Sequence, residues 1–241
     1  MKILFGLALV VLAATMTLYT VEAKTLFEDY FNKGTDRWSF AENAGKFQVK
    51  DDSSVPGGYG PEVLNMQTPS DWSAAYVKDV EVTDCIVIAL VKDISLPKTG
   101  EDADQVIIAR TQGETGIGNE TGDALEQDAP DDTGLHLFGG GGQDITVSAH
   151  HSTGEWTWMM LRLEGNEVKA KVWGFDEPEP DWLVELDEPV YKSGGVGMGI
   201  WSGELHVAYY AVADLEGLAV DAQNKLIVTW GEVKAALISH Q

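Results

Sequence analysis

The stretch that decides the fold is WTWMMLRLEGNEVKAKVW, which runs from Trp156 to Trp173. Two runs of alternating side chains flank a Gly165-Asn166 pair, and period-two patterning on both sides of such a pair predicts a β-hairpin. One row must face a core; it consists of Thr157, Met159, Leu161, Leu163, Val168, Ala170 and Val172. The opposite row mixes aromatic and charged groups and is either a solvated face or a binding face; it consists of Trp156, Trp158, Met160, Arg162, Glu164, Lys169, Lys171 and Trp173.

Strand-like segments recur along the rest of the chain, separated by turn signals about every 8–12 residues. They are expected at 26–31, 46–49, 63–66, 74–77, 82–94, 105–111, 134–138, 144–151, 182–186, 194–201 and 205–213. A turn is expected at 69–72, and the acidic, glycine-rich residues 113–133 are expected to form a long surface loop. Because each sheet would have one apolar face to bury, the sequence predicts an all-β sandwich of two antiparallel sheets.

Both ends of the chain carry segments that we expect to lie outside this domain. Residues 1–23 combine one basic residue, a short apolar run and small residues before a cleavage point, as in a secretory signal peptide. An uncleaved membrane anchor is the alternative, although the run is short for a bilayer. Cleavage would leave a domain at 24–216 that is secreted, periplasmic or on the cell surface and does not insert into a membrane. The tail, 217–241, is expected to end in a short helix with Trp230, Val233 and Leu237 on one side.

The charge balance restricts the partners of the chain. It has 39 Asp and Glu against 16 Lys and Arg, so its net charge is −23. Nucleic acid and anionic lipid surfaces would be repelled, whereas cations would be attracted. Cys85 is the only cysteine, so an intrachain disulfide is impossible. Its apolar strand context indicates a small core residue rather than a reactive thiol.

Several motifs taken together resemble a known family. They are Phe27-Glu28-Asp29 with Phe31 and Trp38, the central hairpin, Glu177-Pro178-Glu179-Pro180-Asp181-Trp182, and Gly194-Gly195-Val196-Gly197-Met198-Gly199. On these motifs, residues 26–216 look like the concanavalin A-like lectin/glucanase superfamily, specifically its bacterial laminin-G-like jelly-roll domains. The resemblance implies two curved antiparallel sheets with a concave face that often binds saccharide. Members include lectins, glucanases, lyases, adhesive modules and spacers, so the fold does not fix the function.

A saccharide site needs flat aromatic faces and a few hydrogen-bond donors. Some side chains would line one such face if their strands were neighbours; they are Trp158, Arg162, His136, Arg110 and Trp201. The alternative is that the tryptophans pack in the core or at the sandwich ends and that Arg162 pairs with Glu164.

Calcium is the cofactor that the resemblance suggests, with Glu28 and Asp29 as candidate oxygen ligands. Many relatives carry Asp-Asp or Asp-Asn on the last strand, where this chain has Tyr209-Tyr210. Calcium takes six to eight oxygen ligands, so two acidic residues do not complete a site.

No catalytic set stands out in the sequence. Retaining glycosidases need two carboxylates at a fixed separation on one face. The nearest candidates are Glu185 and Asp187, but position 189, where the next acid would stand, is Pro189. His150 and His151 are neighbours on a strand and point to opposite faces, so they do not chelate one metal ion together.

These observations favour an exported, non-catalytic module that binds carbohydrate, such as a polysaccharide or glycan, or another extracellular ligand. The second hypothesis is a carbohydrate-active enzyme, either a glycoside hydrolase or a polysaccharide lyase. The third is a structural or adhesive module without a small ligand.

Overall fold

A computed structural model describes residues 24–41, 46–95, 104–113, 122–127, 134–139, 143–149, 153–187, 191–215, 219–220 and 226–227. These residues form fifteen β-strands and contain no helix, and so none of them belongs to a helix that could cross a bilayer. The predicted signal peptide, 1–23, lies outside the described residues, as do Trp230, Val233 and Leu237 of the predicted tail helix. Within the tail, β14 (Ala219–Val220) pairs with β15 (Leu226–Ile227).

The central hairpin is confirmed. Its strands are β10 (Thr157–Glu164) and β11 (Glu167–Gly174), which pair from Thr157 opposite Gly174 to Glu164 opposite Glu167. The connection is the expected Gly165-Asn166 pair, and Gly165 adopts φ +55°, a conformation that suits a tight hairpin turn.

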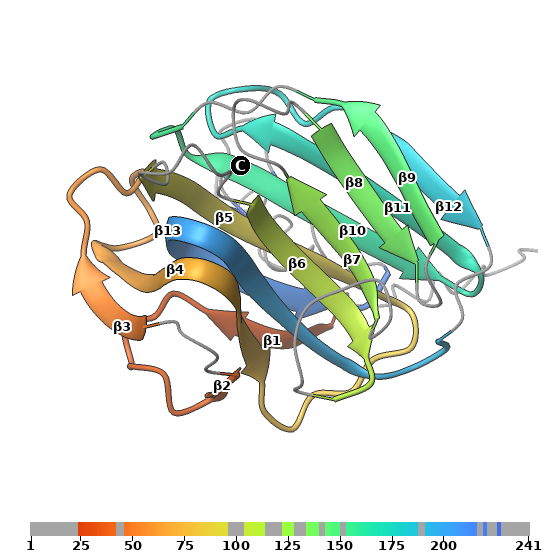
Figure 1. Ribbon diagram of the computed structural model, residues 1–241, viewed down its shortest axis with the longest axis horizontal. Coiled ribbons are helices and arrows are strands. Elements are labelled where there is room, and N and C mark those ends of the chain that lie inside the picture. The colour runs from red at the N-terminus through yellow and green to blue at the C-terminus, as the bar shows by residue number, and fades with distance from the viewer. Residues whose placement is uncertain are drawn as a thin grey trace, which may run out of the picture.

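The strands lie in two layers, one in front of the other in the view of Figure 1. The front layer contains β2 (Trp38–Ala41), β6 (Asp104–Thr111), β7 (Asp123–Gln127), β8 (Gly134–Gly139) and β9 (Gln143–Ser148). The back layer contains β1 (Thr25–Asp29), β3 (Lys46–Asp51), β5 (Cys85–Ser95), β10, β11 and β12 (Val184–Asp187). Two long strands, β4 (Glu62–Val77) and β13 (Gly195–Ala213), belong to both layers.

Strand β13 passes from one layer to the other at a bulge. Its first part pairs with β6 and its last part with β5 and β1, while β4 accompanies it across the change. The β4–β13 register shifts between Trp201 and Gly203, and Ser202 and Gly203 both have positive φ, at +57° and +82°. A bulge of this kind bends the paired strands.

The predicted break at 69–72 is wrong, because β4 continues through it as one strand. Likewise 194–201 and 205–213 are parts of one strand, β13. Thr68 lies opposite Gly203 and Trp72 opposite Trp201, so residues 69–71 face the bulge. Pro69 therefore stands where the ladder is already interrupted, and its missing N–H group removes no regular ladder bond.

One apolar core fills the space between the layers. The predicted inward row of the hairpin is buried there, with Met159, Leu161 and Leu163 fully enclosed. Strand β10 packs against β6 and β7, and β12 packs against β8 and β9. The prediction of a surface loop at 113–133 is wrong for 123–127, which form β7 and bury Leu125 in this core. A lone leucine between acidic residues gives no alternation that would identify a buried strand.

The outward row of the hairpin is largely buried rather than solvated. Trp158 and Met160 belong to a second apolar cluster on the outer side of the back layer. The ring of Trp158 lies 6.2 Å from that of Trp173 and 5.6 Å from that of Tyr59, which comes from the connection between β3 and β4. We call this the back-face cluster; its buried members are Tyr59, Val63, Ile86, Ile88, Leu90, Trp156, Trp158, Met160, Trp173, Ala208, Tyr209 and Ala211.

The two-layer core predicts a large difference between two Leu→Ala substitutions. Leu161 is fully buried between the layers, whereas Leu183 is 41% exposed. We expect Leu161→Ala to lower the free energy of unfolding by about 2–5 kcal/mol, because it leaves a cavity in the core. Leu183→Ala should change it by less than about 0.5 kcal/mol. Urea denaturation followed by tryptophan fluorescence measures both, and equal losses would contradict the proposed core.

Candidate functional site

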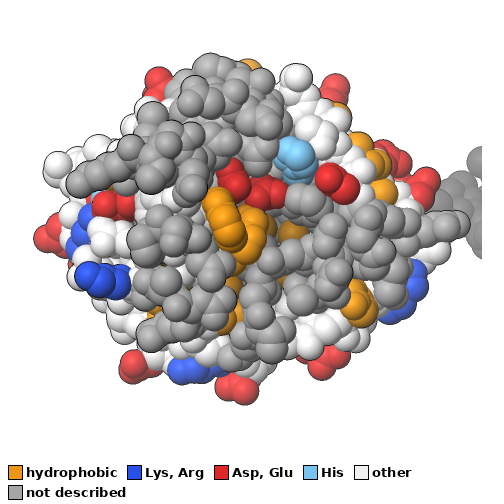
Figure 2. Space-filling view, in the orientation of Figure 1, with side chains coloured by type: hydrophobic (Ala, Val, Ile, Leu, Met, Phe, Trp, Pro, Cys, Tyr) orange, Lys and Arg blue, Asp and Glu red, His pale blue; other side chains and the backbone are white. Residues whose placement is uncertain are grey.

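The outward-pointing side chains of the front layer form a surface that we call the front face. The strand register aligns one row of residues across it: Gly199, Val106, Glu126, His136 and Thr146, on β13, β6, β7, β8 and β9 in turn. Figure 2 looks onto this side of the molecule, where hydrophobic side chains lie near the middle and acidic and histidine side chains lie beside them. Aromatic, carboxylate and imidazole groups therefore share one surface.

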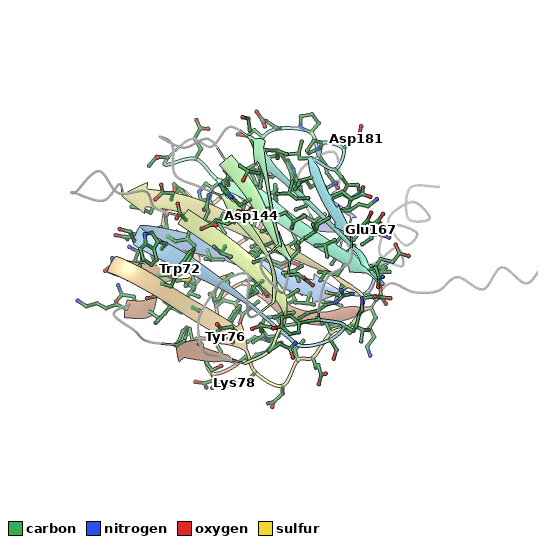
Figure 3. All side chains as sticks on the ribbon, turned by 45° about the vertical axis from the view of Figure 1, so that its right-hand side comes forward. Trp72, Tyr76, Lys78, Asp144, Glu167 and Asp181 are labelled. Atoms are coloured by element: carbon green, nitrogen blue, oxygen red, sulfur yellow. The ribbon has the colours of Figure 1, made fainter. Side chains whose placement is uncertain are left out.

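An aromatic pair occupies one end of the front face. Trp72 of β4 lies opposite Trp201 of β13, with ring centroids 5.4 Å apart and ring planes at 60°. Both side chains are partly exposed. Further along β4, Tyr76 lies against Gly197, where an added Cβ atom would come within 2.9 Å of the Tyr76 ring and 2.5 Å of a backbone oxygen. Figure 3 shows Trp72 and Tyr76 on β4.

Carboxylates and an imidazole occupy the other part of the front face. His136 Nδ1 lies 3.0 Å from Thr146 Oγ1 and 3.4 Å from a carboxylate oxygen of Asp144. Glu126 is nearly buried and lies opposite His136. Asp104 is partly exposed and stands two residues from the position opposite Glu126, so these two residues are diagonal neighbours, whose backbones lie about 7–8 Å apart by sheet geometry.

This combination can bind a polyhydroxylated ligand, because ring faces take up its apolar side while carboxylate, imidazole and hydroxyl groups exchange hydrogen bonds with it. Three strand spacings separate Trp201 on β13 from His136 on β8. At about 4.8 Å per strand, this is roughly 14 Å. A ligand that contacts both residues must therefore be extended.

The five residues predicted for one binding surface lie in three separate places. Trp201 and His136 are on the front face, whereas Trp158 and Arg162 are on the outer side of the back layer. Arg110 lies at the end of the sandwich. The predicted hollow is therefore not assembled, because β10 and β8 belong to different layers. The binding roles of the accessible residues, His136, Arg162 and Trp201, stay predictions.

Two of these side chains on β10 have structural contacts. Trp158 is 0% exposed in the back-face cluster and presents no ring face to a ligand. Arg162 pairs with Glu164 at 2.6 Å and with Glu167 at 3.7 Å, the alternative that its neighbours in sequence suggested.

Arg110 is buried, and its side chain links neighbouring segments through a hydrogen bond and ion pairs. It is 1% exposed, has φ +52° and sits where the β6–β13 register shifts, which turns its side chain away from the front face. Its Nε donates to the carbonyl of Thr83 at 2.8 Å, and its guanidinium lies 3.3 Å from Asp84 and 3.7 Å from the fully buried Asp123. A buried carboxylate needs such a counter-charge.

The two predicted calcium ligands do not converge. Asp29 is buried and accepts hydrogen bonds from the Phe31 amide at 2.7 Å and from Trp38 Nε1 at 2.9 Å. Glu28 points to the other side of β1, where it accepts one from the Tyr209 hydroxyl at 2.8 Å. Alternation along a strand separates their oxygens, so this pair does not fit a calcium ion.

The other residues that the sequence suggested for catalysis or metal binding are a cysteine, a pair of acids on β12 and two adjacent histidines. Cys85 is buried, and burial raises the pKa of its thiol to about 12, so the thiol is inert. Glu185 pairs with Lys169 at 3.1 Å and, with the partly exposed Glu167 and the exposed Asp187, forms an acidic group where β11 begins and β12 ends. The adjacent histidines, 150 and 151, lie outside the described residues.

A network of charged residues lies on the outer side of the back layer, next to the back-face cluster. The carboxylate of Asp52 lies 2.6 Å from Lys92 Nζ and 2.6 Å from His206 Nδ1. The other imidazole nitrogen lies 3.1 Å from Glu204, which also pairs with Lys50 at 2.6 Å. Burial raises the pKa of Asp52, but hydrogen bonds from Lys92, its own loop and His206 outweigh this and hold the pKa well below its usual range.

The lowered pKa of Asp52 predicts a pH dependence of stability. A carboxyl group whose folded pKa is depressed stabilises the fold above its unfolded pKa, about 3.9, and this contribution is lost as the pH falls through the folded pKa. We expect Asp52→Asn to cost about 1–3 kcal/mol at neutral pH, because Lys92 and His206 lose their partner. Its unfolding free energy should also fall less steeply than that of the parent protein below about pH 4.

Urea unfolding at a series of pH values measures this difference. Asp36→Asn is the matched control and should follow the parent protein, because Asp36 is exposed and its contact with Lys78 Nζ, at 3.0 Å, is made by its backbone carbonyl, which the substitution keeps. Parallel curves for Asp52→Asn and the parent would contradict the inferred role of the network.

Sequence reasoning missed Trp72, Asp104 and Glu126 as front-face residues. Trp72 was expected in a turn, and Glu126 in a loop. A usable signal was present in β13, where Gly195, Gly197, Gly199 and Trp201 alternate with the core residues Val196, Met198 and Ile200 and so share one outward row. The partners of that row on β4, β6 and β7 depend on strand order, which no local pattern contains.

Comparisons with known proteins bear on the fold. No protein-family model matches the chain, and no curated protein matches its sequence significantly. Among solved structures, the carbohydrate-binding module CBM66 from Bacillus subtilis matches with a TM-score of 0.53 and 9% identity, over 74% of this chain and 96% of that one. A glycoside hydrolase family 16 endo-glucanase from Bacteroides ovatus matches with a TM-score of 0.53 and 11% identity, over 78% and 99%.

The exoplasmic/lumenal domain of VIP36, in a Ca2+-bound form, matches with a TM-score of 0.54 and 12% identity, over 85% of this chain and 96% of that one. These structures confirm the predicted all-β, two-sheet antiparallel jelly-roll sandwich. At such low identity the likeness concerns the fold alone.

Proposed function

We propose that this protein is a non-catalytic binding module that holds an extended saccharide on its front face. The observation that carries the proposal is the partly exposed pair Trp72 and Trp201, which lies on the same surface as Asp104, Glu126 and His136. Aromatic rings beside a few polar groups are the usual composition of a saccharide site.

The distribution of the other tryptophans supports this choice. Trp38, Trp156, Trp158 and Trp173 are buried, so their rings serve packing. Trp182 is partly exposed, but Lys171 Nζ lies 4.3 Å from its ring centroid, on the back layer. Among the described residues, the partly exposed tryptophans of the front layer are therefore Trp72 and Trp201.

The structural neighbours add support of a general kind. One is described as a carbohydrate-binding module, one as an endo-glucanase in complex with G4G3G-2F-DNP, and one as a lumenal domain that also has a Ca2+/Man-bound form. From these descriptions we take only the class of ligand, a saccharide, as a proposal for this protein.

Removing either ring of the front-face pair should weaken saccharide binding. We expect Trp72→Ala and Trp201→Ala each to reduce affinity at least about tenfold, or about 1.4 kcal/mol, because each ring supplies a stacking face. Affinity gel electrophoresis against mixed-linkage glucan and mannan, extended by a glycan array, identifies a ligand, and calorimetry then measures the affinity.

Trp182→Ala is the matched control, because it removes a partly exposed tryptophan from the opposite side of the molecule. It should leave the affinity unchanged. Saccharide binding that survives both front-face substitutions, or no binding across the array, would refute the proposal.

A second function is favoured by one specific observation. Asp104 and Glu126 are diagonal neighbours on the front face, so two carboxyl groups on adjacent strands could flank one glycosidic bond, the arrangement that glycosidases use. In that case one carboxyl group would protonate the leaving oxygen while the other acted as a nucleophile or activated a water molecule. The protein would then be a glycoside hydrolase.

The two functions differ in their response to amide substitutions. If the acids only bind, Asp104→Asn and Glu126→Gln should alter affinity while the parent protein releases no reducing ends from mixed-linkage glucan or mannan. If they catalyse, the parent should release reducing ends and each variant should lose at least about 100-fold in rate. We expect the first outcome, and a reducing-sugar assay distinguishes them.

Two further proposals concern the kind of domain and the export of the protein. We infer that the domain is of the laminin-G-like kind and that the protein is exported after cleavage near residue 23. The motifs within residues 26–216 support the first inference, and the N-terminal apolar run followed by small residues supports the second. N-terminal sequencing of the protein recovered from the culture medium or periplasm would yield a start near Lys24, and an intact Met1 would refute cleavage.

Calcium dependence remains a proposal that the same titrations address. Glu28 and Asp29 are each engaged in internal hydrogen bonds, so we do not expect them to bind calcium. If saccharide binding requires calcium, it should therefore require calcium in Glu28→Gln as well. Saccharide titrations in calcium and in a chelator, with parent and variant, measure this.

A further inference from the structure

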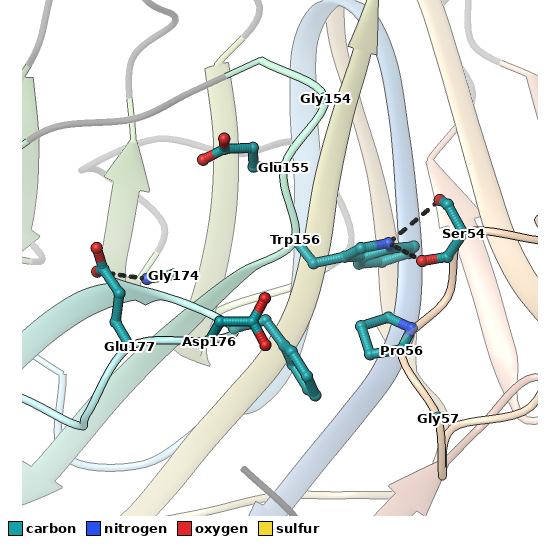
Figure 4. A pocket seen from close by; sticks show the side chains of 10 residues that line it. Ser54, Pro56, Gly57, Gly154, Glu155, Trp156, Gly174, Asp176 and Glu177 are labelled. Atoms are coloured by element: carbon teal, nitrogen blue, oxygen red, sulfur yellow. Dashed lines mark hydrogen bonds between the residues drawn. The ribbon is translucent and has the colours of Figure 1, made fainter. Parts of the chain in front are cut away.

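A pocket of about 640 Å³ opens beside the back-face cluster, on the other side of the molecule from the front face (Figure 4). Three segments meet there: the connection after β3, the start of β10 and the end of β11. The backbone joins two of them, since the Phe175 amide donates to the Trp156 carbonyl at 2.8 Å. This volume lies within the range of small-molecule sites.

Two aromatic side chains form fixed walls of the pocket. The indole N–H of Trp156 donates to the carbonyl of Ser54 at 2.8 Å, as the dashed lines in Figure 4 show. Phe175 is partly exposed, and its inner side stacks on Trp158 with ring centroids 6.4 Å apart. The walls are therefore formed before any ligand binds, which lowers the entropy cost of binding.

Three exposed carboxylates, from Glu155, Asp176 and Glu177, line the same pocket. Glu177 accepts one hydrogen bond from the Gly174 amide at 3.1 Å. Glu155 and Asp176 form no hydrogen bond or ion pair within the part of the chain that the structure describes. No Lys, Arg or His is among the described residues that line the pocket.

Several other acids on this side of the molecule do have a cationic partner. Acids elsewhere on the same side of the molecule are paired with cations: Glu164 with Arg162, Glu179 with Lys171, Glu185 with Lys169, and Asp52 with Lys92. In a protein with a net charge of −23, three carboxylates without a cationic partner that line one pocket with aromatic rings favour a cationic ligand.

The charged network described above holds one wall in place. Lys92 donates to Asp52 and to the Ser54 hydroxyl, so the connection that carries Ser54 is tied to β5. The Lys92 ammonium lies 4.8 Å from the Trp156 ring centroid, but Asp52, 2.6 Å away, offsets its charge. The potential in the pocket is therefore set by its own carboxylates.

We propose that this pocket binds a small organic cation through a primary ammonium group. The ammonium group donates hydrogen bonds to Glu155 and Asp176, and the rings of Trp156 and Phe175 contact the carbon body of the ligand. An amino sugar and an alkyl diamine both present this chemistry. The site is independent of saccharide binding on the front face.

Calorimetry with the purified protein tests the proposal with three probes: glucosamine, cadaverine, and N-acetylglucosamine as a neutral analogue. We expect at least one of the two amines to bind, and N-acetylglucosamine to bind at least about tenfold more weakly. Glu155→Gln and Asp176→Asn should each weaken amine binding at least about tenfold, the effect of losing one charge-assisted hydrogen bond. Binding of glucosamine alone identifies the source as an amino sugar, and binding of cadaverine alone identifies an alkyl amine.

Asp36→Asn is the matched control, because it removes the same charge from an exposed site elsewhere. It should leave amine affinity unchanged, as should Trp72→Ala on the front face. Unchanged urea midpoints verify that the variants are folded.

Four results would overturn the proposal. The first is that neither amine produces heat in calorimetry or shifts the Trp156 indole N–H signal in nuclear magnetic resonance spectra. The second is that N-acetylglucosamine binds as tightly as the amines, and the third is that Asp36→Asn weakens amine binding as much as the pocket variants do. The fourth is that equimolar calcium displaces the amine.

Discussion

Two long strands, β4 and β13, run through both layers, and their shared bulge at Ser202-Gly203 is the constraint on which the rest of the structure depends. If these strands stayed in one layer, the strands of the second layer that pair with them would lose their hydrogen-bonding partners. Because both strands cross, the outward row of β13 changes sides of the molecule at the bulge. Its first part contributes Gly197 and Trp201 to the front face, and its last part contributes Tyr209 to the back-face cluster.

The two outer surfaces differ in how their charges are arranged. On the front face, Glu126 and His136 lie opposite each other in a row whose other members are Gly199, Val106 and Thr146. On the back, most acids are neutralised by lysine or arginine, and aromatic rings fill the space between them. Uncompensated carboxylates remain at the edge of those rings, in the pocket of Glu155 and Asp176. We therefore propose a neutral, hydroxylated ligand for the front face and a cation for the pocket.

The sequence predicted the architecture well because alternation is a local property. The inward row of β10 and β11 could be read directly, and so could the Gly165-Asn166 turn. The layer to which each strand belongs is not local, and this is why Trp158 and Trp201 were expected on one face although they lie on opposite sides. Arg110 was expected on a binding face because a register shift that reverses its direction leaves no mark in the sequence. Trp72 was hidden for a related reason, since Pro69 resembles a turn signal where the strand continues.

The central claim is that the front face, and not the aromatic back face, receives the saccharide. Nuclear magnetic resonance mapping tests it most directly, with backbone amide and indole signals recorded during titration of the best-binding polysaccharide fragment. The account predicts that the largest shifts fall on the Trp72 and Trp201 indoles and on amides of β6, β7 and β13 before the bulge. Shifts concentrated on β10, β11 and the Trp156 indole, with the front face silent, would contradict it.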